Sequence, residues 1–310
     1  MKKPTKATDK LILPLAVLDG VKPVAPGWFA KCVETPATDA STEVSGVNIR
    51  YRVWGEAGKP GLIFVHGGVA HKGWWDFIVP FFVPHFRVVA LDLSGMGESG
   101  WRETYNVELY ADEVLACATA AGLFDNAQKP WVIGHSFGGF VALGFAAKFG
   151  QQIQGAVVID SPIRPADKQE RSAPKTRGGK LYGSEAAALA RFRLLPSQQC
   201  ENLFLIDHIA RHGLKQVDGG WKWRFDPELW PKMRYDMRAA IETVSAITTP
   251  ITLIRGERSA LVNDEVWQFM KQAFPLSQHH VSIPGAQHHV MLDQPLALVS
   301  SLRTILGSGI

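Results

Sequence analysis

Short apolar runs separated by glycine-rich turns dominate the chain from residue 43 onward. Apart from one threonine, every position in these runs is apolar, and many are β-branched, a pattern typical of strands covered on both faces by helices. The runs are Leu62–Val65, Val88–Leu91, Trp131–Ile133, Ala156–Ile159 and Ile251–Ile254. Residues 49–54 alternate instead, and Val47-Asn48 before them is predicted to form a hairpin turn. We therefore predict a mostly parallel sheet.

Helical periodicity lies between the strand runs. Apolar residues recur at a spacing near 3.6 in four segments, residues 106–121, 138–149, 263–274 and 294–306. Strands that alternate with helices predict an α/β fold, with a mostly parallel central sheet flanked by helices. The predicted core comprises residues 43–161 and 248–310. Residues 1–42, which hold Pro and Lys with weak periodicity, form a predicted N-terminal arm.

The alternation stops between residues 162 and 247, where we find no strand run. Ser184 can cap a helix over 185–193, Ser197 can cap one that ends at Gly213, and Asp226-Pro227 can begin a third. We predict a helical cap inserted over the sheet. This segment has 15 Lys and Arg against 10 Asp and Glu. We interpret this surplus of positive charge as a solvated surface. The alternative is that it favours anionic substrates such as carboxylate-bearing monoesters.

The strongest chemical motif is Gly134-His135-Ser136-Phe137-Gly138, which lies between a predicted strand and a predicted helix. Small neighbours are needed at such a turn because the backbone is strained and the helix packs closely. The turn raises the Ser136 hydroxyl above the sheet, where the free N–H groups of the helix N-terminus face developing negative charge. This context predicts a nucleophilic serine; an incidental serine in a glycine-rich turn is the alternative.

A serine needs a base to accept its proton, and His288 is the best-placed histidine. It follows the run His280–Ile283, at the strand edge where α/β proteins bind ligands, and its neighbour His289 is the alternative. A second glycine-rich turn follows Leu62–Val65. We predict that the backbone N–H groups of Gly68, in this turn, and of Phe137 form an oxyanion hole. His66, beside Gly68, is expected to brace the loop.

These motifs, in this order, resemble those of the α/β-hydrolase fold family, specifically its lidded esterase, C–C hydrolase and dehalogenase-like branch. The resemblance covers residues 43–160 and 248–308, through His66-Gly67, the stretch Asp92–Ser99, the Gly134–Gly138 turn and the His288 loop. It implies a Ser-His-acid triad and catalysis without a cofactor. Relatives that open alkyl halides or epoxides use Asp as the nucleophile, so Ser136 favours acyl chemistry.

The chain departs from this family at the triad acid. The resemblance places an Asp 29 residues before His288, but Ser259 stands there, and a hydroxyl cannot compensate an imidazolium charge. Asp160, 24 residues after Ser136, ends a strand at which some capped members carry the acid. We predict Asp160 as the acid, with Asp264 and Glu257 as alternatives.

Several aromatic and histidine residues give weaker signals. Trp74 and Trp223 are predicted to line a substrate pocket, although tryptophans of this kind can equally belong to the core. His208 and His212 have the spacing of a zinc pair but lack the Glu of the zinc motif and a third ligand. We therefore expect no metal and no organic cofactor.

Composition excludes several classes of protein. The 310 residues include 46% hydrophobic and 20% charged residues, enough to bury a sizeable core. A net charge of +4 without a Lys/Arg run does not favour nucleic acid. Three widely spaced cysteines, no apolar stretch long enough to span a bilayer and no secretory signal lead us to expect a cytoplasmic protein.

Together these features predict a serine hydrolase that cleaves small carboxylic esters through an acyl-enzyme, using Ser136, His288 and Asp160. Two alternatives remain open. One is a C–C bond hydrolase acting on a dienoic diketone-like acid, which would use the same triad under the same kind of cap. The other is a ligand-binding receptor that keeps the fold without turnover, an interpretation that the serine at position 259 favours.

Overall fold

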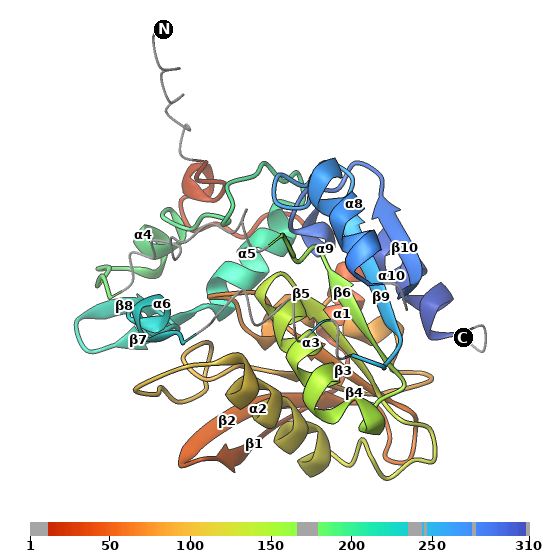
Figure 1. Cartoon of the computed structure of the whole chain (residues 1–310). Helices are drawn as coiled ribbons and strands as arrows, with labels where there is room; N and C mark the ends of the chain where they lie inside the picture. The colour runs from red at the N-terminus through yellow and green to blue at the C-terminus, as the bar shows by residue number, and fades with distance from the viewer. Residues whose placement is uncertain (1–11, 166–178, 235–243, 245–246, 275–276, 308–310) are drawn as a thin grey trace, which may run out of the picture.

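The computed structural model describes residues 12–165, 179–234, 244, 247–274 and 277–307. These residues build an eight-stranded sheet in the order β1-β2-β4-β3-β5-β6-β9-β10 (Figure 1). The strands β3 to β6, β9 and β10 run parallel, and β1 and β2 are antiparallel at one edge. The predicted fold class is confirmed. The strands are β1 (Thr38–Val44), β2 (Val47–Trp54), β3 (Gly61–Val65), β4 (Arg87–Leu91), β5 (Trp131–His135), β6 (Gly155–Ile159), β9 (Ile251–Gly256) and β10 (Ser277–Ile283).

Helices cover both faces of the sheet because its inner strands are apolar on both sides. Ile63 and Val65 of β3 face one hydrophobic cluster, which includes α2 (Val107–Ala120), α3 (Phe137–Phe149) and α8 (Asp264–Ala273). The alternate residues Leu62 and Phe64 face a second cluster on the other side. That cluster includes α1 (Gly27–Val33), α9 (Val290–Asp293) and α10 (Pro295–Leu306).

The helices predicted from periodicity are confirmed within a few residues, and side chains explain two of their starts. Asn106 accepts a hydrogen bond from the Leu109 N–H at 2.7 Å and begins α2. Asn263 accepts one from the Val266 N–H at 3.0 Å and begins α8. Short 3-10 turns complete the core: η1 (Ala16–Leu18), η2 (Lys72–Trp75), η3 (Val79–Phe81) and η4 (Gly150–Gln152).

The N-terminal region differs from the prediction. Strand β1 begins at Thr38 and so crosses the predicted boundary between residues 42 and 43. The hairpin turn predicted at Val47-Asn48 is wrong, because Val44 pairs with Val47 and the turn residues are Ser45 and Gly46, both with positive φ. Periodicity missed β1 because it is an edge strand, largely exposed and polar, with only Val44 fully buried.

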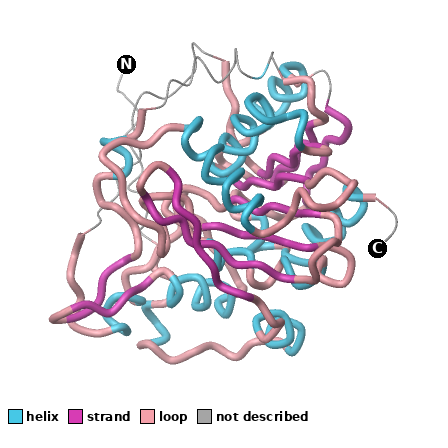
Figure 2. Tube along the Cα trace, turned by 90° about the horizontal axis from the view of Figure 1, so that it is seen from below, coloured by secondary structure: helices cyan, strands magenta, loops and turns pink. Residues whose placement is uncertain are grey.

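The segment predicted as a helical cap contains helices, and it also contains a β-hairpin that the prediction missed. The helices are α4 (Glu185–Leu189), α5 (Leu203–His212) and α6 (Leu229–Lys232). The hairpin joins β7 (Leu214–Val217) and β8 (Gly220–Trp223), and Figure 2 shows this strand pair set apart from the main sheet. Its four-residue strands are too short to give a clear periodicity.

Of the four helix ends predicted in the cap, two are confirmed and two lie at other residues. Ser184 accepts a hydrogen bond from the Ala187 N–H at 3.1 Å, and Gly213 follows the last residue of α5. However, α5 begins after Asn202 rather than at Ser197. The helix predicted at Asp226-Pro227 begins only at Leu229, because Asp226 instead accepts the Glu228 N–H within a turn.

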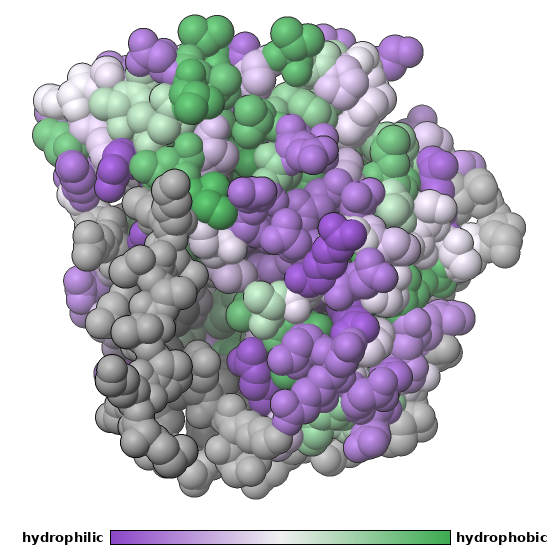
Figure 3. Space-filling view, turned by 90° about the horizontal axis from the view of Figure 1, so that it is seen from above, coloured by the Kyte–Doolittle hydropathy of each residue, from purple (hydrophilic) through white to green (hydrophobic). Residues whose placement is uncertain are grey.

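The cap is tied to the core by main-chain and side-chain bonds. The Asp226 N–H donates to the Gly95 carbonyl at 2.7 Å, and the Tyr105 hydroxyl donates to the Asp226 carboxylate at 2.8 Å. Seen from above, hydrophobic and hydrophilic areas alternate over the surface, and neither covers the whole face (Figure 3). Among the described helices, none combines the length and apolarity that crossing a bilayer requires.

Candidate active site

Ser136 lies at a strained turn between β5 and α3. Its backbone angles, φ 52° and ψ −117°, are rare for a residue with a side chain. The neighbouring glycines explain how the chain reaches this conformation. A Cβ at Gly134 would collide with the Gly138 carbonyl, and one at Gly138 would collide with the Val65 carbonyl of β3. Strand and helix therefore approach closely, and Ser136 remains partly exposed at the sheet edge.

His288 lies beside this serine, on the loop that connects β10 to α9. Its Nε2 is 3.0 Å from the Ser136 Oγ, and its Nδ1 is 2.7 Å from the Asp160 Oδ2. The ring is almost fully buried, as is the aspartate. The structure therefore brings together the serine, histidine and aspartate that the sequence selected, with each nitrogen of the ring facing one partner. Such distances permit proton transfer from Ser136 to His288.

Asp160 is held in place at the end of β6 by four contacts. Its own N–H donates to the Ile254 carbonyl at 2.7 Å, and its φ is positive at 48°. One carboxylate oxygen accepts the Gly256 N–H at 2.8 Å. The other accepts the Ser259 hydroxyl at 2.6 Å as well as the His288 ring N–H. The buried charge is thus surrounded by donors, as a buried carboxylate requires.

The two alternative acids lie elsewhere. Asp264 is exposed and pairs with Arg255 at 2.8 Å, at the first turn of α8. Glu257 is also exposed and accepts the Gly285 N–H at 2.9 Å. Neither carboxylate is bonded to His288, whose Nδ1 is already engaged by Asp160.

The predicted oxyanion donors lie on adjacent turns. A Cβ added to Gly68 would be 3.6 Å from the Cβ of Phe137, so the turn after β3 packs directly on the start of α3. In the part of the chain that the structure describes, neither the Gly68 N–H nor the Phe137 N–H donates to a protein acceptor. Two free N–H groups beside a serine are the arrangement that stabilises an oxyanion.

His66 braces the turn that carries Gly68, as expected. Its Nδ1 is 2.7 Å from the Gly67 carbonyl, and its Nε2 accepts the Leu93 N–H at 3.1 Å. Complete burial lowers the pKa of His66, so the ring remains neutral. A neutral ring with both nitrogens occupied is suited to support and not to proton transfer.

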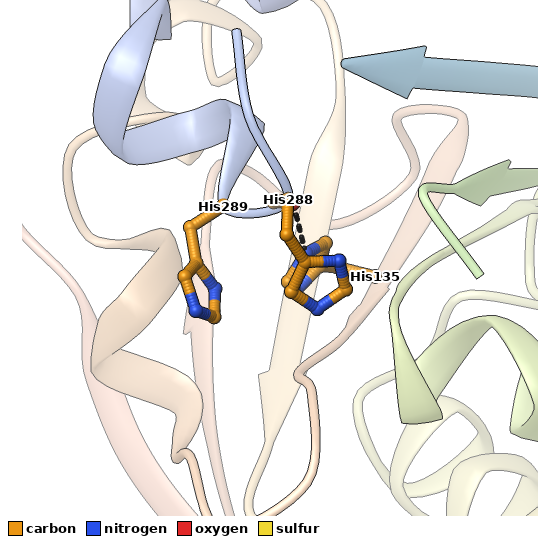
Figure 4. A group of neighbouring side chains, drawn as sticks. All are labelled: His135, His288 and His289. Atoms are coloured by element: carbon orange, nitrogen blue, oxygen red, sulfur yellow. Dashed lines mark hydrogen bonds between the residues drawn. The ribbon is translucent and has the colours of Figure 1, made fainter. Parts of the chain in front are cut away.

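The imidazole rings of His135, His288 and His289 lie close together (Figure 4). His135 Nε2 donates to the His288 carbonyl oxygen at 2.9 Å, which ties the Ser136 turn to the His288 loop. The ring of His289 lies 4.7 Å from that of His288, and its backbone N–H donates to Gln198 at 3.0 Å. Burial, together with the neighbouring His288, lowers the pKa of both His135 and His289 well below the usual value. His135 and His289 therefore stay neutral beside His288.

Among the residues that the structure describes, two groups of side chains could offer ligands to a metal. His135, His288 and His289 have ring nitrogens within 4.8 Å of one another. A metal there would take a His288 nitrogen from either Asp160 or Ser136. The absence of a metal therefore stays a prediction, and the contacts of His288 favour its role beside the serine.

The second group adds a carboxylate to the helical histidine pair. His208 and His212 are joined by Asp76, a third donor that sequence spacing could not reveal. His208 Nε2 lies 3.0 Å from an Asp76 oxygen, and Arg52 pairs with the other oxygen at 3.0 Å. Asp76 is therefore already satisfied by two partners, and its contacts with His208 in the cap and Arg52 in the core account for the group.

A cavity of about 340 Å³ opens between the cap and the turn after β3. Trp74 and Trp223, the two tryptophans selected from the sequence, both line it. Trp75 instead lies fully buried in the core. The ring of Trp230, in α6, stands over the proposed oxyanion hole, 2.8 Å from where a Cβ of Gly68 would be.

The fold and this geometry define an α/β protein in which a partly exposed serine meets a buried histidine and aspartate at the carboxyl edge of the sheet, the place where ligands bind in such folds. The chain belongs to the alpha/beta hydrolase family, whose model matches residues 62–301.

Individual relatives extend over most of the chain. It is 26% identical over 261 residues to esterase Rv0045c of Mycobacterium tuberculosis, covering 82% of this chain and 84% of the relative. It is 32% identical over 268 residues to the bifunctional esterase/perhydrolase DCH of Acinetobacter calcoaceticus, covering 80% and 91%. The solved structure of an E-2-(acetamidomethylene)succinate hydrolase matches with a TM-score of 0.71 at 21% identity, covering 87% of this chain and 99% of that chain. This last likeness shows a shared fold.

Proposed function

We propose that the protein is a serine hydrolase that cleaves carboxylic esters of small molecules. The observation that carries this proposal is the hydrogen-bonded series from the Ser136 Oγ through the His288 ring to Asp160, at 3.0 and 2.7 Å. Family membership and the similarity to an esterase and to an esterase/perhydrolase support it. A cytoplasmic location stays a prediction.

In the proposed reaction the Ser136 Oγ attacks the carbonyl carbon of the ester while His288 Nε2 takes the hydroxyl proton. Asp160 accepts a hydrogen bond from the Nδ1–H of His288 and stabilises the imidazolium. The N–H groups of Gly68 and Phe137 hold the oxyanion, an effect worth about 3 kcal/mol per donor in comparable sites. The C–O bond to the alcohol then breaks, and His288 returns the proton to the departing alkoxide.

Water completes the cycle. His288 takes a proton from water, whose oxygen attacks the acyl carbon, and the acid leaves as Ser136 regains its proton. Each step uses one base, His288, in its two protonation states. No step requires a metal or an organic cofactor.

A direct test uses short para-nitrophenyl esters. The purified protein should release nitrophenolate, and Ser136→Ala should abolish this release while the melting temperature is retained. A fluorophosphonate probe should label the unmodified protein at Ser136. Undiminished turnover by Ser136→Ala would overturn the proposal, as would tight ligand binding without acylation, which is the behaviour expected of a receptor.

One observation favours the C–C hydrolase alternative as a second candidate. Arg191 and Arg193 line the cavity next to the site and could clamp a substrate carboxylate, which the acids cleaved by such enzymes carry. Parallel assays on an aryl ester and on a dienoic diketone-like acid separate the two reactions. Turnover of the acid alone would assign the second function.

A further inference from the structure

The cavity beside the active site is unusually rich in cations. Four basic side chains line it: Lys180, Arg191, Arg193 and Arg224. Among the described residues of the lining there is no Asp or Glu. Aromatic side chains, including Trp74 and Trp223, form much of the remaining wall. The cavity thus combines an apolar body with several positive charges.

The cavity cations differ in whether they have a carboxylate partner. Arg224 lies 3.3 Å from Glu98, and its Nε donates to the Leu214 carbonyl at 2.7 Å. By contrast, within the described part of the chain, Arg191 and Arg193 form no ion pair and no side-chain hydrogen bond. Two guanidinium groups without counter-ions on the wall of one cavity favour an anion.

Two acids of the cap pair with another arginine. Asp207 and Glu185 both bind Arg211, at 2.8 and 2.9 Å. Their negative charge is therefore directed at a different guanidinium, outside the cavity lining. This arrangement leaves the positive charge of Arg191 and Arg193 available to a ligand.

The cavity begins next to the proposed catalytic groups. Val69, which lines it, is joined directly to Gly68. Trp74, on the same wall, has its ring 5.4 Å from that of His289, the neighbour of His288. An ester held at Ser136 could therefore extend into the cavity with the part that does not react. A volume of about 340 Å³ is in the range of small-molecule sites.

We propose that the substrate is an ester whose non-reacting end carries an anionic group, carboxylate or phosphate, bound by Arg191 and Arg193. The apolar and aromatic wall would hold the carbon chain between that group and the scissile carbonyl. This inference rests on the proposed hydrolysis at Ser136 and names the substrate class for the same site.

The test compares two substrates of equal length, the para-nitrophenyl monoester of adipic acid and para-nitrophenyl hexanoate. The first ends in a carboxylate and the second in a methyl group. We expect the protein to prefer the adipate monoester in kcat/KM. Substituting both arginines (Arg191→Gln with Arg193→Gln) should lower kcat/KM for the adipate monoester about tenfold or more, because charge-assisted contacts are lost. The hexanoate ester should change less than twofold.

The hairpin of the cap offers a matched control. Lys215 and Lys222 are paired across β7 and β8, on the face opposite to the pair Leu214 and Trp223. Neither lysine lines the cavity. Substituting both by Gln removes the same amount of charge from the cap, and both substrates should keep their kcat/KM. Equal losses in the two double variants would mean that net charge and not the cavity attracts the anion, which would overturn the proposal.

Two measurements on the unmodified protein test the same proposal without any substitution. Raising the salt concentration should reduce the preference for the adipate monoester and leave hexanoate turnover unchanged, because salt screens partly exposed charges. Hexanoate ion and hexyl phosphate can also be compared as inhibitors of para-nitrophenyl hexanoate hydrolysis. The lower inhibition constant tells whether the cavity prefers a carboxylate or a phosphate.

Failure of this inference is distinguishable from failure of the proposed function. Ser136-dependent hydrolysis of both esters with no preference for the adipate monoester rejects the anionic substrate alone. Hydrolysis that survives Ser136→Ala rejects the proposed function itself.

Discussion

The Ser259 hydroxyl donates a 2.6 Å hydrogen bond to Asp160 Oδ2, the same oxygen that accepts the His288 ring N–H at 2.7 Å. Ser259 stands where the family resemblance places the triad acid. A hydroxyl at this position supplies no negative charge, but it holds in place the carboxylate of Asp160, which is the proposed acid.

We expect Ser259→Ala to reduce kcat/KM for short esters about tenfold, since hydrogen bonds to charged groups contribute about 1.5–3 kcal/mol. Ser259→Thr, which keeps the hydroxyl, should retain most of the activity. Steady-state kinetics on the two variants make the comparison. Loss of activity in both variants with unchanged melting temperatures would assign the effect to packing and not to the hydrogen bond.

Moving the acid back to the family position should partly restore an inactive variant. Asp160→Asn should lower kcat by a factor of about 10⁴, as removal of a triad carboxylate does elsewhere. Adding Ser259→Asp to Asp160→Asn supplies a carboxylate at a position whose present side chain bonds the same Asp160 oxygen as the His288 ring. We expect kcat to recover at least tenfold. If the folded double variant is no more active than Asp160→Asn, a carboxylate at position 259 cannot replace that of Asp160 beside the imidazole.

The free space around Gly68 is limited by Trp230, and this gives a steric prediction. A methyl group at Gly68 would lie 2.8 Å from the Trp230 ring. Gly68→Ala should therefore displace the turn that carries the proposed oxyanion donor and lower kcat. In a Trp230→Ala background the clash is absent, so the fold-loss of kcat caused by Gly68→Ala should be about ten times smaller. A double-mutant cycle measures this coupling, and additive effects would contradict it.

Folding stability should fall as the solution becomes acidic below pH 6.5. Burial lowers the pKa of His71 from 6.5 to about 4, and the pKa values of His66, His135 and His289 are lowered in the same direction. The unfolded chain binds protons at these rings as the pH falls through 6.5, whereas the native protein does not. The stabilisation is therefore complete above pH 6.5 and is lost between that pH and the lowered values.

Urea unfolding across this range measures the effect. His71 alone should contribute a loss of about 2 kcal/mol in the free energy of unfolding at pH 5, at about 1.4 kcal/mol for each unit of pKa shift. His71→Gln should reduce the slope of stability against pH, with His85→Gln at an exposed position as the matched control. An unchanged slope in His71→Gln would show that His71 titrates alike in both states.

Local features of the site were predictable because short stretches of sequence encode them. The Gly134–Gly138 turn needs glycine on both sides of Ser136 to let α3 pack on β3, and that requirement is visible as a motif. The loop that holds His288 and His289 could be located because it follows a strand and so reaches the sheet edge, but the contact with Ser136 that singles out His288 came from the structure. The four periodic helices and the inner strands were likewise readable from spacing alone.

Other features were not predictable because residues far apart in the chain create them. Strand β6 pairs with β9 in a register that sets Ile159 opposite Ile254, so Asp160 ends beside Gly256 and Ser259. Sequence spacing suggested Asp160 but could not exclude Asp264 or Glu257. The hairpin β7–β8 and the edge strand β1 were missed because neither is long and regularly apolar.

The sequence by itself determined the layered α/β architecture and the serine turn, because both follow from apolar periodicity and from glycines at fixed spacing. Only the tertiary structure decided which carboxylate meets the imidazole, where Trp230 stands and which arginines share a cavity. Those relationships depend on strand register and on the path of the cap. Both are set by packing over separations of tens to more than a hundred residues, which no local pattern records.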